Sequence, residues 1–390
     1  MKKHIRKTLI FIILLLAYFI LDYFFPTYFV TLFGGFMGVR WYTHILIFFG
    51  SFGLVILLHE LAHAFAFLIK GITPKMVLIL IFLFYKEVKW HLRIDPKLII
   101  LGGGMVMPDF GPIHSEIDID YYKKATSFSL MFAPVFTIVF SSILFVLNIF
   151  FFYNIPLLTV FNFYILIFSL FFTYTSTLSA QGIYGDFVAH KKVMQDPVFS
   201  LSIVSQFVDD VTPFHYGFMK SRLMAERPSD FSIHLINFYS TLLEKGIYDD
   251  TEIDVELLEK AKVLATHPHL VRKIIRNHQQ LITIQQTIVY LYRCQEDTLM
   301  ELIYDIFKSE IEQSKIKESA KTYYLKQTAH FLNRADESDY LTKNHDFSVG
   351  LMDFILSHLP EYQNAEKERL QPIERFEKKE MIHLDNTELM

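Results

Sequence analysis

Cysteine is almost absent from this chain of 390 residues, in which Cys294 is the only example. A single thiol cannot form an intramolecular disulfide, and it cannot build a zinc site of the kind held by several cysteines. Any metal ion bound by this chain must therefore be held by histidine and carboxylate side chains.

Charged side chains are also scarce over half of the chain. Asp, Glu, Lys and Arg make up 20% of the residues, but they are sparse up to Asp186 and dense after it. The net charge of -4 gives no reason to expect nucleic-acid binding. Hydrophobic residues make up 52%, 40 residues are Phe, and the mean hydropathy is +0.30. This composition indicates an integral membrane protein with a more polar C-terminal half.

Four apolar stretches are long enough to cross a membrane as helices. They cover residues 8–25, 43–69, 125–152 and 157–178. No small-x-small cleavage site closes the first stretch, so we expect it to be retained rather than removed as a signal peptide. Lys and Arg residues precede the first stretch and follow the last, which places both termini in the cytoplasm. The sequence thus predicts a multi-pass protein of the cell membrane.

Residues 76–107 do not have the pattern of another helix pair. Residues 76–85 are apolar but too few to cross as a helix, and residues 87–95 alternate between apolar and polar side chains. The alternation predicts a half-buried strand, within a membrane-associated segment of two or three short strands. Its exposed edge near residues 87–95 could pair with an extended peptide. A second alternation, at residues 116–120, indicates a solvated strand or loop.

After residue 196, apolar residues recur with helical spacing and polar faces. We therefore predict a membrane domain over residues 1–195 and a helical, soluble cytoplasmic domain over residues 196–362. A polar, loose tail follows over residues 363–390. The expected fold class is mainly α: a polytopic membrane protein with about four transmembrane helices, a short β segment and a helical C-terminal domain whose partner the sequence leaves open.

The stretch His59-Glu60-Leu61-Ala62-His63 lies within the second expected span. Two imidazoles four residues apart lie on one face of a helix, and a carboxylate beside the first can reach a water on a metal that both hold. Glu60 is the only Asp, Glu, Lys or Arg between Trp41 and Lys70. Ionisable groups inside a membrane helix are costly and usually functional, so a chance match is the less favoured interpretation.

A catalytic zinc ion usually has three protein ligands and one open position. Asp186 is the best-placed third ligand, because it follows the last expected span near its cytoplasmic end, with Gly182 and Gly185 allowing close approach. Two alternatives stay open. Asp186 could simply end a transmembrane segment, and His190, four residues further on, could supply the ligand instead. The sequence also leaves open cobalt or iron in place of zinc.

These residues resemble the site-2 protease family of intramembrane zinc metalloproteases. That family carries His-Glu-x-x-His in one membrane helix and an aspartate ligand near the end of a later one, with short membrane-associated strands between them. Residues 59–63 match the first motif fully, and Tyr184-Gly185-Asp186-Phe187 matches the second in its aspartate. Ala133-Pro134 is similar to the family's Gly-Pro segment, and Leu101-Gly102-Gly103-Gly104 to a Gly-rich strand region. The resemblance covers roughly residues 43–190.

The resemblance implies an intramembrane endopeptidase with one Zn²⁺ held by His59, His63 and Asp186, and with Glu60 as general base. Its site would face the cytoplasm and cleave membrane-embedded segments or leader peptides, so the expected partners are a membrane protein or peptide substrate and the lipid bilayer. The alternative is a catalytically silent membrane interaction or immunity protein on the same scaffold, acting through its helical C-terminal domain. Metal content and the function of a His59→Ala variant discriminate between the two.

Overall fold

The computed structural model describes residues 34–377 except 102, 181–182, 209, 228–230, 251, 277–279 and 345–368, together with residues 16, 19, 23 and 30. The first expected span, residues 8–25, therefore lies almost entirely outside the described residues. The chain divides into two compact units. The first comprises residues 1–111 and 116–209, and the second residues 112–115 and 210–390. The boundary expected after residue 195 falls within the first unit.

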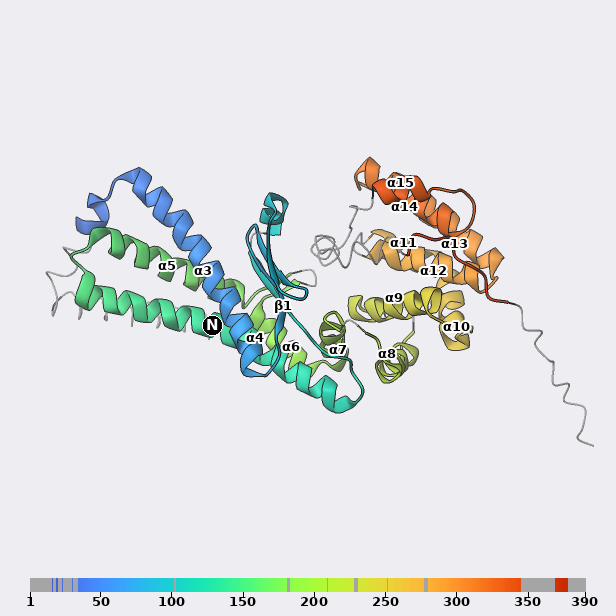
Figure 1. Ribbon diagram of the computed structural model, residues 1–390, viewed down its shortest axis with the longest axis horizontal. Helices are drawn as coiled ribbons and strands as arrows, with labels where there is room; N and C mark the ends of the chain where they lie inside the picture. The colour runs from blue at the N-terminus through green and yellow to red at the C-terminus, as the bar shows by residue number, and fades with distance from the viewer. Residues whose placement is uncertain are drawn as a thin grey trace, which may run out of the picture. The chain divides into compact units, whose positions relative to one another are not determined.

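Three helices in the described part of the first unit are long and apolar enough to cross a membrane. They are α3 (Trp41–Ile69), α4 (Glu116–Leu147), which continues through a π-helical turn (Asn148–Phe152), and α5 (Pro156–Thr175). These helices run alongside one another (Figure 1) and match the spans expected at residues 43–69, 125–152 and 157–178. Their length and composition suggest membrane association.

Helix α3 is apolar on every side. It buries Val55 with Ile165 and Phe168 of α5, and Ile56 with residues of the neighbouring sheet. Other large apolar side chains of α3, including Phe49 and Phe65, are exposed. A helix that is hydrophobic all round but only partly covered by protein is typical of a membrane span.

Helix α4 begins at Glu116, so the prediction of a strand or loop at residues 116–120 is wrong. Glu116 and Asp118 lie in the first turn of the helix, where negative charge interacts favourably with the helix dipole. Tyr121 in the second turn donates a hydrogen bond to the backbone carbonyl of Lys70 at the end of α3. Five alternating residues are too few to distinguish a strand from the first turns of a helix.

A four-stranded antiparallel sheet lies between α3 and α4 in the chain. Its strands are β1 (Pro74–Ile79), β2 (Phe82–Lys86), β3 (Trp90–Ile94) and β4 (Gly104–Pro108), with a 3-10 helix (Pro96–Leu101) before the last. The order in the sheet is β3-β2-β1-β4, so β3 and β4 are the two edges. The strand segment expected at residues 76–107 is therefore present, with four strands instead of the two or three expected.

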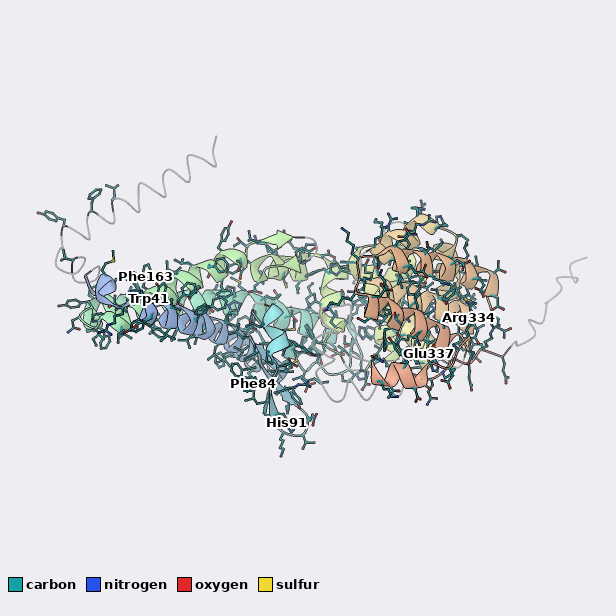
Figure 2. All side chains as sticks on the ribbon, turned by 90° about the horizontal axis from the view of Figure 1, so that it is seen from above. Trp41, Phe84, His91, Phe163, Arg334 and Glu337 are labelled. Atoms are coloured by element: carbon teal, nitrogen blue, oxygen red, sulfur yellow. The ribbon has the colours of Figure 1, made fainter. Side chains whose placement is uncertain are left out.

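The half-buried strand expected at residues 87–95 needs correction. Residues 87–89 form the turn before β3, and four of the five residues of β3 are exposed. Strand β3 pairs only with β2, at the sheet edge farthest from β4. Figure 2 shows His91 of β3 at the tip of the sheet, whereas Trp41 and Phe163 lie at the far end of the long helices. Alternation indicates an extended chain, but burial depends on what covers it.

A short hairpin follows α5. Its strands are β5 (Ser179–Ala180) and β6 (Ile183–Tyr184), and helices α6 (Asp186–Gln195) and α7 (Pro197–Ser205) complete the first unit. The Asp196 side chain caps α7 by accepting hydrogen bonds from the backbone amides of Val198 and Phe199, both at 3.0 Å. The hairpin reverses the chain directly in front of Asp186.

The second unit is helical in its described residues, as the spacing predicted. Its helices are α8 (Pro213–Ala225), α9 (Ile233–Tyr248), α10 (Val255–Ala265), α11 (Pro268–Arg276), α12 (Leu281–Arg293), α13 (Asp297–Gln313), α14 (Glu318–Phe331) and α15 (Ser338–Lys343). Large buried side chains, among them Tyr239, Tyr290 and Phe307, form its core. Residues 369–377 of the expected tail are packed rather than loose, because Leu370, Ile373 and Phe376 are buried.

Candidate metal centre

His59, His63 and Asp186 meet inside the first unit. The two histidines lie one turn apart on α3 and are 7% and 9% exposed. The Nε2 atom of His59 lies 3.1 Å from Oδ2 of Asp186, and Nε2 of His63 lies 3.9 Å from the same oxygen. One ligand atom from each of the three residues lies within 4.8 Å of the others. The structure thus brings together the two imidazoles and the aspartate that the sequence singled out.

The other nitrogen of each imidazole contacts a hydroxyl group on α4. The Nδ1 atom of His59 lies 3.3 Å from Oγ1 of Thr137, and Nδ1 of His63 lies 3.0 Å from Oγ of Ser129. Each of these hydroxyl groups donates its proton to a backbone carbonyl. Thr137 donates to the carbonyl of Ala133 at 2.7 Å, and Ser129 donates to the carbonyl of His63 at 3.2 Å.

Because each hydroxyl donates elsewhere, it must accept from the imidazole that it contacts. Both imidazoles therefore carry their proton on Nδ1, which leaves a lone pair on Nε2 directed toward Asp186. Hydrogen bonds of this kind set the tautomer and orientation of metal-binding histidines. The α4 hydroxyls thus prepare both rings to bind a cation through Nε2.

Asp186 is positioned by the hairpin between α5 and α6. Gly185 lies so close to the backbone of Thr175 and Ser176 that a Cβ at this position would overlap both residues. The carboxylate lies at the first residue of α6, where the helix dipole favours negative charge, and its Oδ2 accepts a hydrogen bond from Ser176 at 3.1 Å. Burial opposes ionisation of Asp186, but the close contact with His59, the His63 imidazole and the hydrogen bond from Ser176 lower its pKa below the ordinary value.

Glu60 is 6% exposed and lies against the first residue of β4. A Cβ at Gly104 would overlap the side chain of Glu60 and the carbonyl oxygen of Leu78 on β1. Only glycine leaves room for the carboxylate at this point, because it has no side chain. Strand β4 therefore limits the space open to the acidic group of the motif, which interacts electrostatically with His59 and Asp186.

This set of donors suits a divalent metal ion. Two neutral imidazole nitrogens and one carboxylate oxygen are ligands that zinc accepts, and three protein ligands leave a position for water or substrate. The side chain of Asp186 is 22% exposed, against 9% and 11% for the two histidines, so the approach to the group is on the aspartate side. The three residues could therefore hold a metal ion that keeps one accessible position.

Among the described residues, no other histidine is part of this group. The Nδ1 atom of His190 lies 2.8 Å from the hydroxyl and 2.9 Å from the carbonyl of Ser127, so its ring is held against α4. His44 contacts the carbonyl of Phe36, and His91 lies beside Glu87. Of the two candidates for the third ligand, the geometry favours Asp186 over His190.

The sequence did not single out Ser129 or Thr137, and it named Gly104 only as part of the glycine-rich stretch at residues 101–104. One signal could have pointed to the hydroxyls. Ser129, Ala133, Thr137 and Ser141 recur every four residues along α4, which gives the helix one face of small residues. Such faces allow close approach of a neighbouring helix in a membrane. The pattern alone does not identify α3 as that neighbour.

Comparisons of this chain with protein-family models, with curated proteins and with solved structures found no match.

Proposed function

We propose that this protein is an intramembrane zinc endopeptidase. The observation that supports the proposal most strongly is the meeting of Asp186 with His59 and His63, which lie on a helix apolar enough to cross a membrane, with ligand atoms within 4.8 Å of one another. His59, Glu60 and His63 are all buried on this helix, where ionisable groups are costly unless they pair or bind a metal. Packing alone does not account for them.

A zinc ion held by these three residues would polarise a water molecule and the carbonyl of a peptide bond. Glu60 then takes a proton from the water as its oxygen bonds to the carbonyl carbon. As the C–N bond breaks, Glu60 passes this proton to the leaving nitrogen, which becomes an amine. Ser129 and Thr137 keep the imidazoles oriented throughout, and Gly104 leaves Glu60 the space that this transfer requires.

Strand β4 provides a place for the substrate. It is an edge of the sheet and begins beside Glu60, and the backbone groups of an edge strand can pair with an extended peptide. A transmembrane helix resists hydrolysis because its amides are hydrogen-bonded within the helix, so the substrate must unwind. Pairing with β4 would hold an unwound segment near the catalytic group. The edge expected near residues 87–95 is β3, on the opposite side of the sheet.

Cleavage by the full-length protein tests this proposal. The wild type and the Glu60→Gln variant are reconstituted in phospholipid vesicles with a panel of synthetic single-span apolar peptides, and products are identified by mass spectrometry. We expect the wild type to cut at least one peptide within its apolar segment. Glu60→Gln should lower the rate roughly 10²- to 10⁴-fold while zinc content stays unchanged.

Glu87→Gln is the matched control, because Glu87 lies in the turn before β3 and pairs with His91. This variant should cleave at the wild-type rate. Equal cleavage by the wild type and Glu60→Gln would reject the mechanism. A wild-type protein that binds zinc but cuts none of the peptides would favour a silent interaction protein on the same scaffold.

A further inference from the structure

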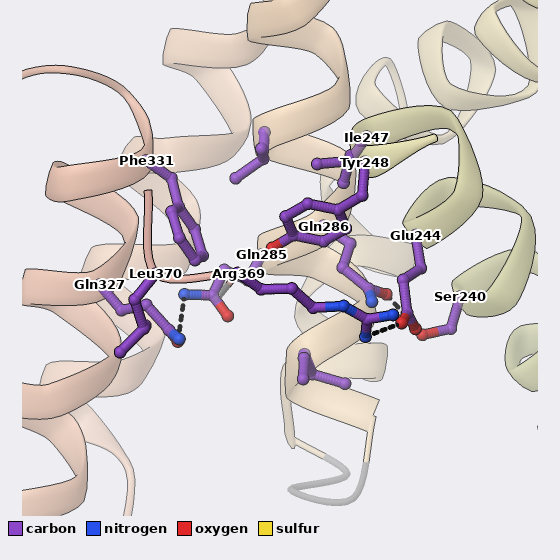
Figure 3. Close-up of a pocket in the computed structure, with 12 residues that line it drawn as sticks. Ser240, Glu244, Ile247, Tyr248, Gln285, Gln286, Gln327, Phe331, Arg369 and Leu370 are labelled. Carbon is purple, nitrogen blue, oxygen red and sulfur yellow. Dashed lines mark hydrogen bonds and ion pairs between the residues drawn. The ribbon is translucent and has the colours of Figure 1, made fainter. Parts of the chain in front are cut away.

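A pocket of about 250 Å³ lies among α9, α12 and α14 of the second unit, closed on one side by Arg369 and Leu370 (Figure 3). Its wall combines carboxamides with apolar side chains. Gln285 and Gln286 of α12 and Gln327 of α14 supply the carboxamides. Phe331 and Leu370 supply part of the apolar surface. The pocket is unrelated to the metal centre and belongs entirely to the C-terminal unit.

The carboxamide of Gln285 is buried at 2% exposure. Its nitrogen donates to Oε1 of Gln327 at 3.1 Å and to Oγ1 of Thr328 at 3.0 Å, so both of its protons are used. Within the described part of the chain, no hydrogen bond reaches its oxygen, which Figure 3 shows turned away from Gln327 and toward the pocket. This oxygen is not among the fully buried atoms without a partner, so the pocket leaves it accessible, and it can accept a hydrogen bond from a ligand that enters.

Gln286 offers the complementary group. Its oxygen accepts a hydrogen bond from the hydroxyl of Ser240, which directs the carboxamide nitrogen to other partners. Adjacent residues of α12 thus present one acceptor and one donor to the same pocket. A peptide unit has the matching pair, because its N–H donates and its C=O accepts.

Charge and size narrow the class of ligand. Arg369 forms an ion pair with Glu244, so the guanidinium near the pocket is already neutralised and does not favour an anion. Sites for drug-sized ligands usually measure roughly 300–1,000 Å³, which is larger than this pocket. The space suits part of a longer chain rather than a whole nucleotide or cofactor.

We propose that this pocket binds an extended, uncharged peptide segment. Gln285 and Gln286 hydrogen-bond one peptide unit, and an adjacent apolar side chain of the ligand packs against Phe331 and Leu370. The C-terminal unit is then a peptide-binding module in its own right. This inference does not depend on metal binding or on catalysis by the first unit.

Binding to the full-length protein in detergent tests the proposal. The probes are fluorescent, uncharged decapeptides with acetylated and amidated ends, which differ in one central apolar residue. Fluorescence polarisation should detect binding of at least one probe. Ile282→Trp, which places a large ring at a partly exposed lining residue, should lower the affinity at least tenfold, and so should Gln286→Leu.

Val263→Trp is the matched control, because Val263 of α10 is similarly exposed but does not line the pocket. It should bind as the wild type does. Methylation of the peptide nitrogen that pairs with Gln285 should lower the affinity as much as Gln286→Leu does. The proposal is wrong if no decapeptide binds, or if binding is the same in Ile282→Trp. Binding of AMP or acetate that Ile282→Trp abolishes would also overturn it, since the pocket would then serve an anion.

Discussion

The Nδ1 atom of His63 lies 3.0 Å from the hydroxyl of Ser129, and that hydroxyl donates its own proton to the carbonyl of His63. A residue of α4 therefore determines which ring nitrogen on α3 is available to a metal. Thr137 contacts the Nδ1 atom of His59 in the same way, but it donates its own proton to the carbonyl of Ala133. The contact between these two helices therefore includes hydrogen bonds that orient the imidazoles, in addition to side-chain packing.

Removing the α4 hydroxyls should weaken metal binding. In Ser129→Ala and Thr137→Val, one imidazole in each variant loses the acceptor that holds its orientation, so we expect zinc affinity to fall roughly 10- to 100-fold. Competition with a chelator of known affinity measures the change. Ser141→Ala is the control. Ser141 lies on the same face of α4 as Ser129 and Thr137, but its hydroxyl bonds to Ser169 of α5 and contacts no imidazole. Unchanged affinity in both hydroxyl variants would show that the rings are oriented by other contacts.

Replacement of Asp186 by Asn should empty the metal site. The amide oxygen is a weaker ligand than a carboxylate and carries no charge to offset that of the cation, so zinc per chain should fall well below one. Elemental analysis after purification measures this content. Asp120→Asn removes an exposed carboxylate that pairs with Lys124, and it should keep the full content. Retention of zinc by Asp186→Asn would mean that a different group completes the site.

A methyl group at Gly104 should disable catalysis without removing the metal. Ala at this position overlaps Glu60 and the carbonyl of Leu78, so the carboxylate must move from its present position. A misplacement of about 1 Å in a catalytic group can cost roughly 100-fold in rate. We expect a loss of this order in vesicle cleavage assays, with zinc content unchanged.

Gly53→Ala provides the comparison for Gly104→Ala. Gly53 lies on α3, and a Cβ there would meet only Leu80, at an ordinary contact distance of 3.7 Å. This variant should cleave normally. Normal cleavage by Gly104→Ala as well would contradict the placement of Glu60 against β4.

The second unit should lose stability in acid because of His215. Burial lowers the pKa of His215 to about 4, from the ordinary value of 6.5. Between these pH values the unfolded state binds more protons than the folded state, so the free energy of unfolding falls as the pH drops from 6.5 toward 4. Above pH 6.5 this contribution is constant. The full loss for such a shift is ~3 kcal/mol.

Thermal unfolding of the full-length protein at pH 7.5 and pH 4.5 measures this effect. His215→Leu has no group to protonate at this position, so its midpoint should fall less between the two pH values than that of the wild type. His269→Leu, at an exposed position on α11, should behave as the wild type does. An equal decrease in His215→Leu and wild type would exclude His215 as the cause.

Scarcity of charge made the centre of the site predictable. Glu60 stands alone among apolar residues, and Asp186 is the first charge after the last span, so both were visible in the sequence. The same contrast between apolar and polar stretches explains why the expected span at residues 43–69 agrees with α3, and why a turn was expected before Pro156. These features depend on composition along the chain, which a single sequence records directly.

Contacts between distant elements were not predictable in the same way. Ser129 and Thr137 are ordinary small polar residues until α3 is placed beside α4, and Gly104 is one glycine of three until β4 is placed against Glu60. The exposure of β3 and the burial of Leu370 also depend on which element covers them. The pattern of apolar and polar residues predicts a helix or strand, but only the fold shows which other part of the chain packs against it.

The separation of 127 residues between His59 and Asp186 has a consequence for how the protein matures. During synthesis the paired imidazoles are made long before the aspartate. An ion bound by all three residues is therefore acquired only after α4 and α5 have been made and the hairpin behind them has closed. Loading with zinc would then be the last step of biogenesis. A chain truncated before residue 186 would be inactive when the ribosome releases it.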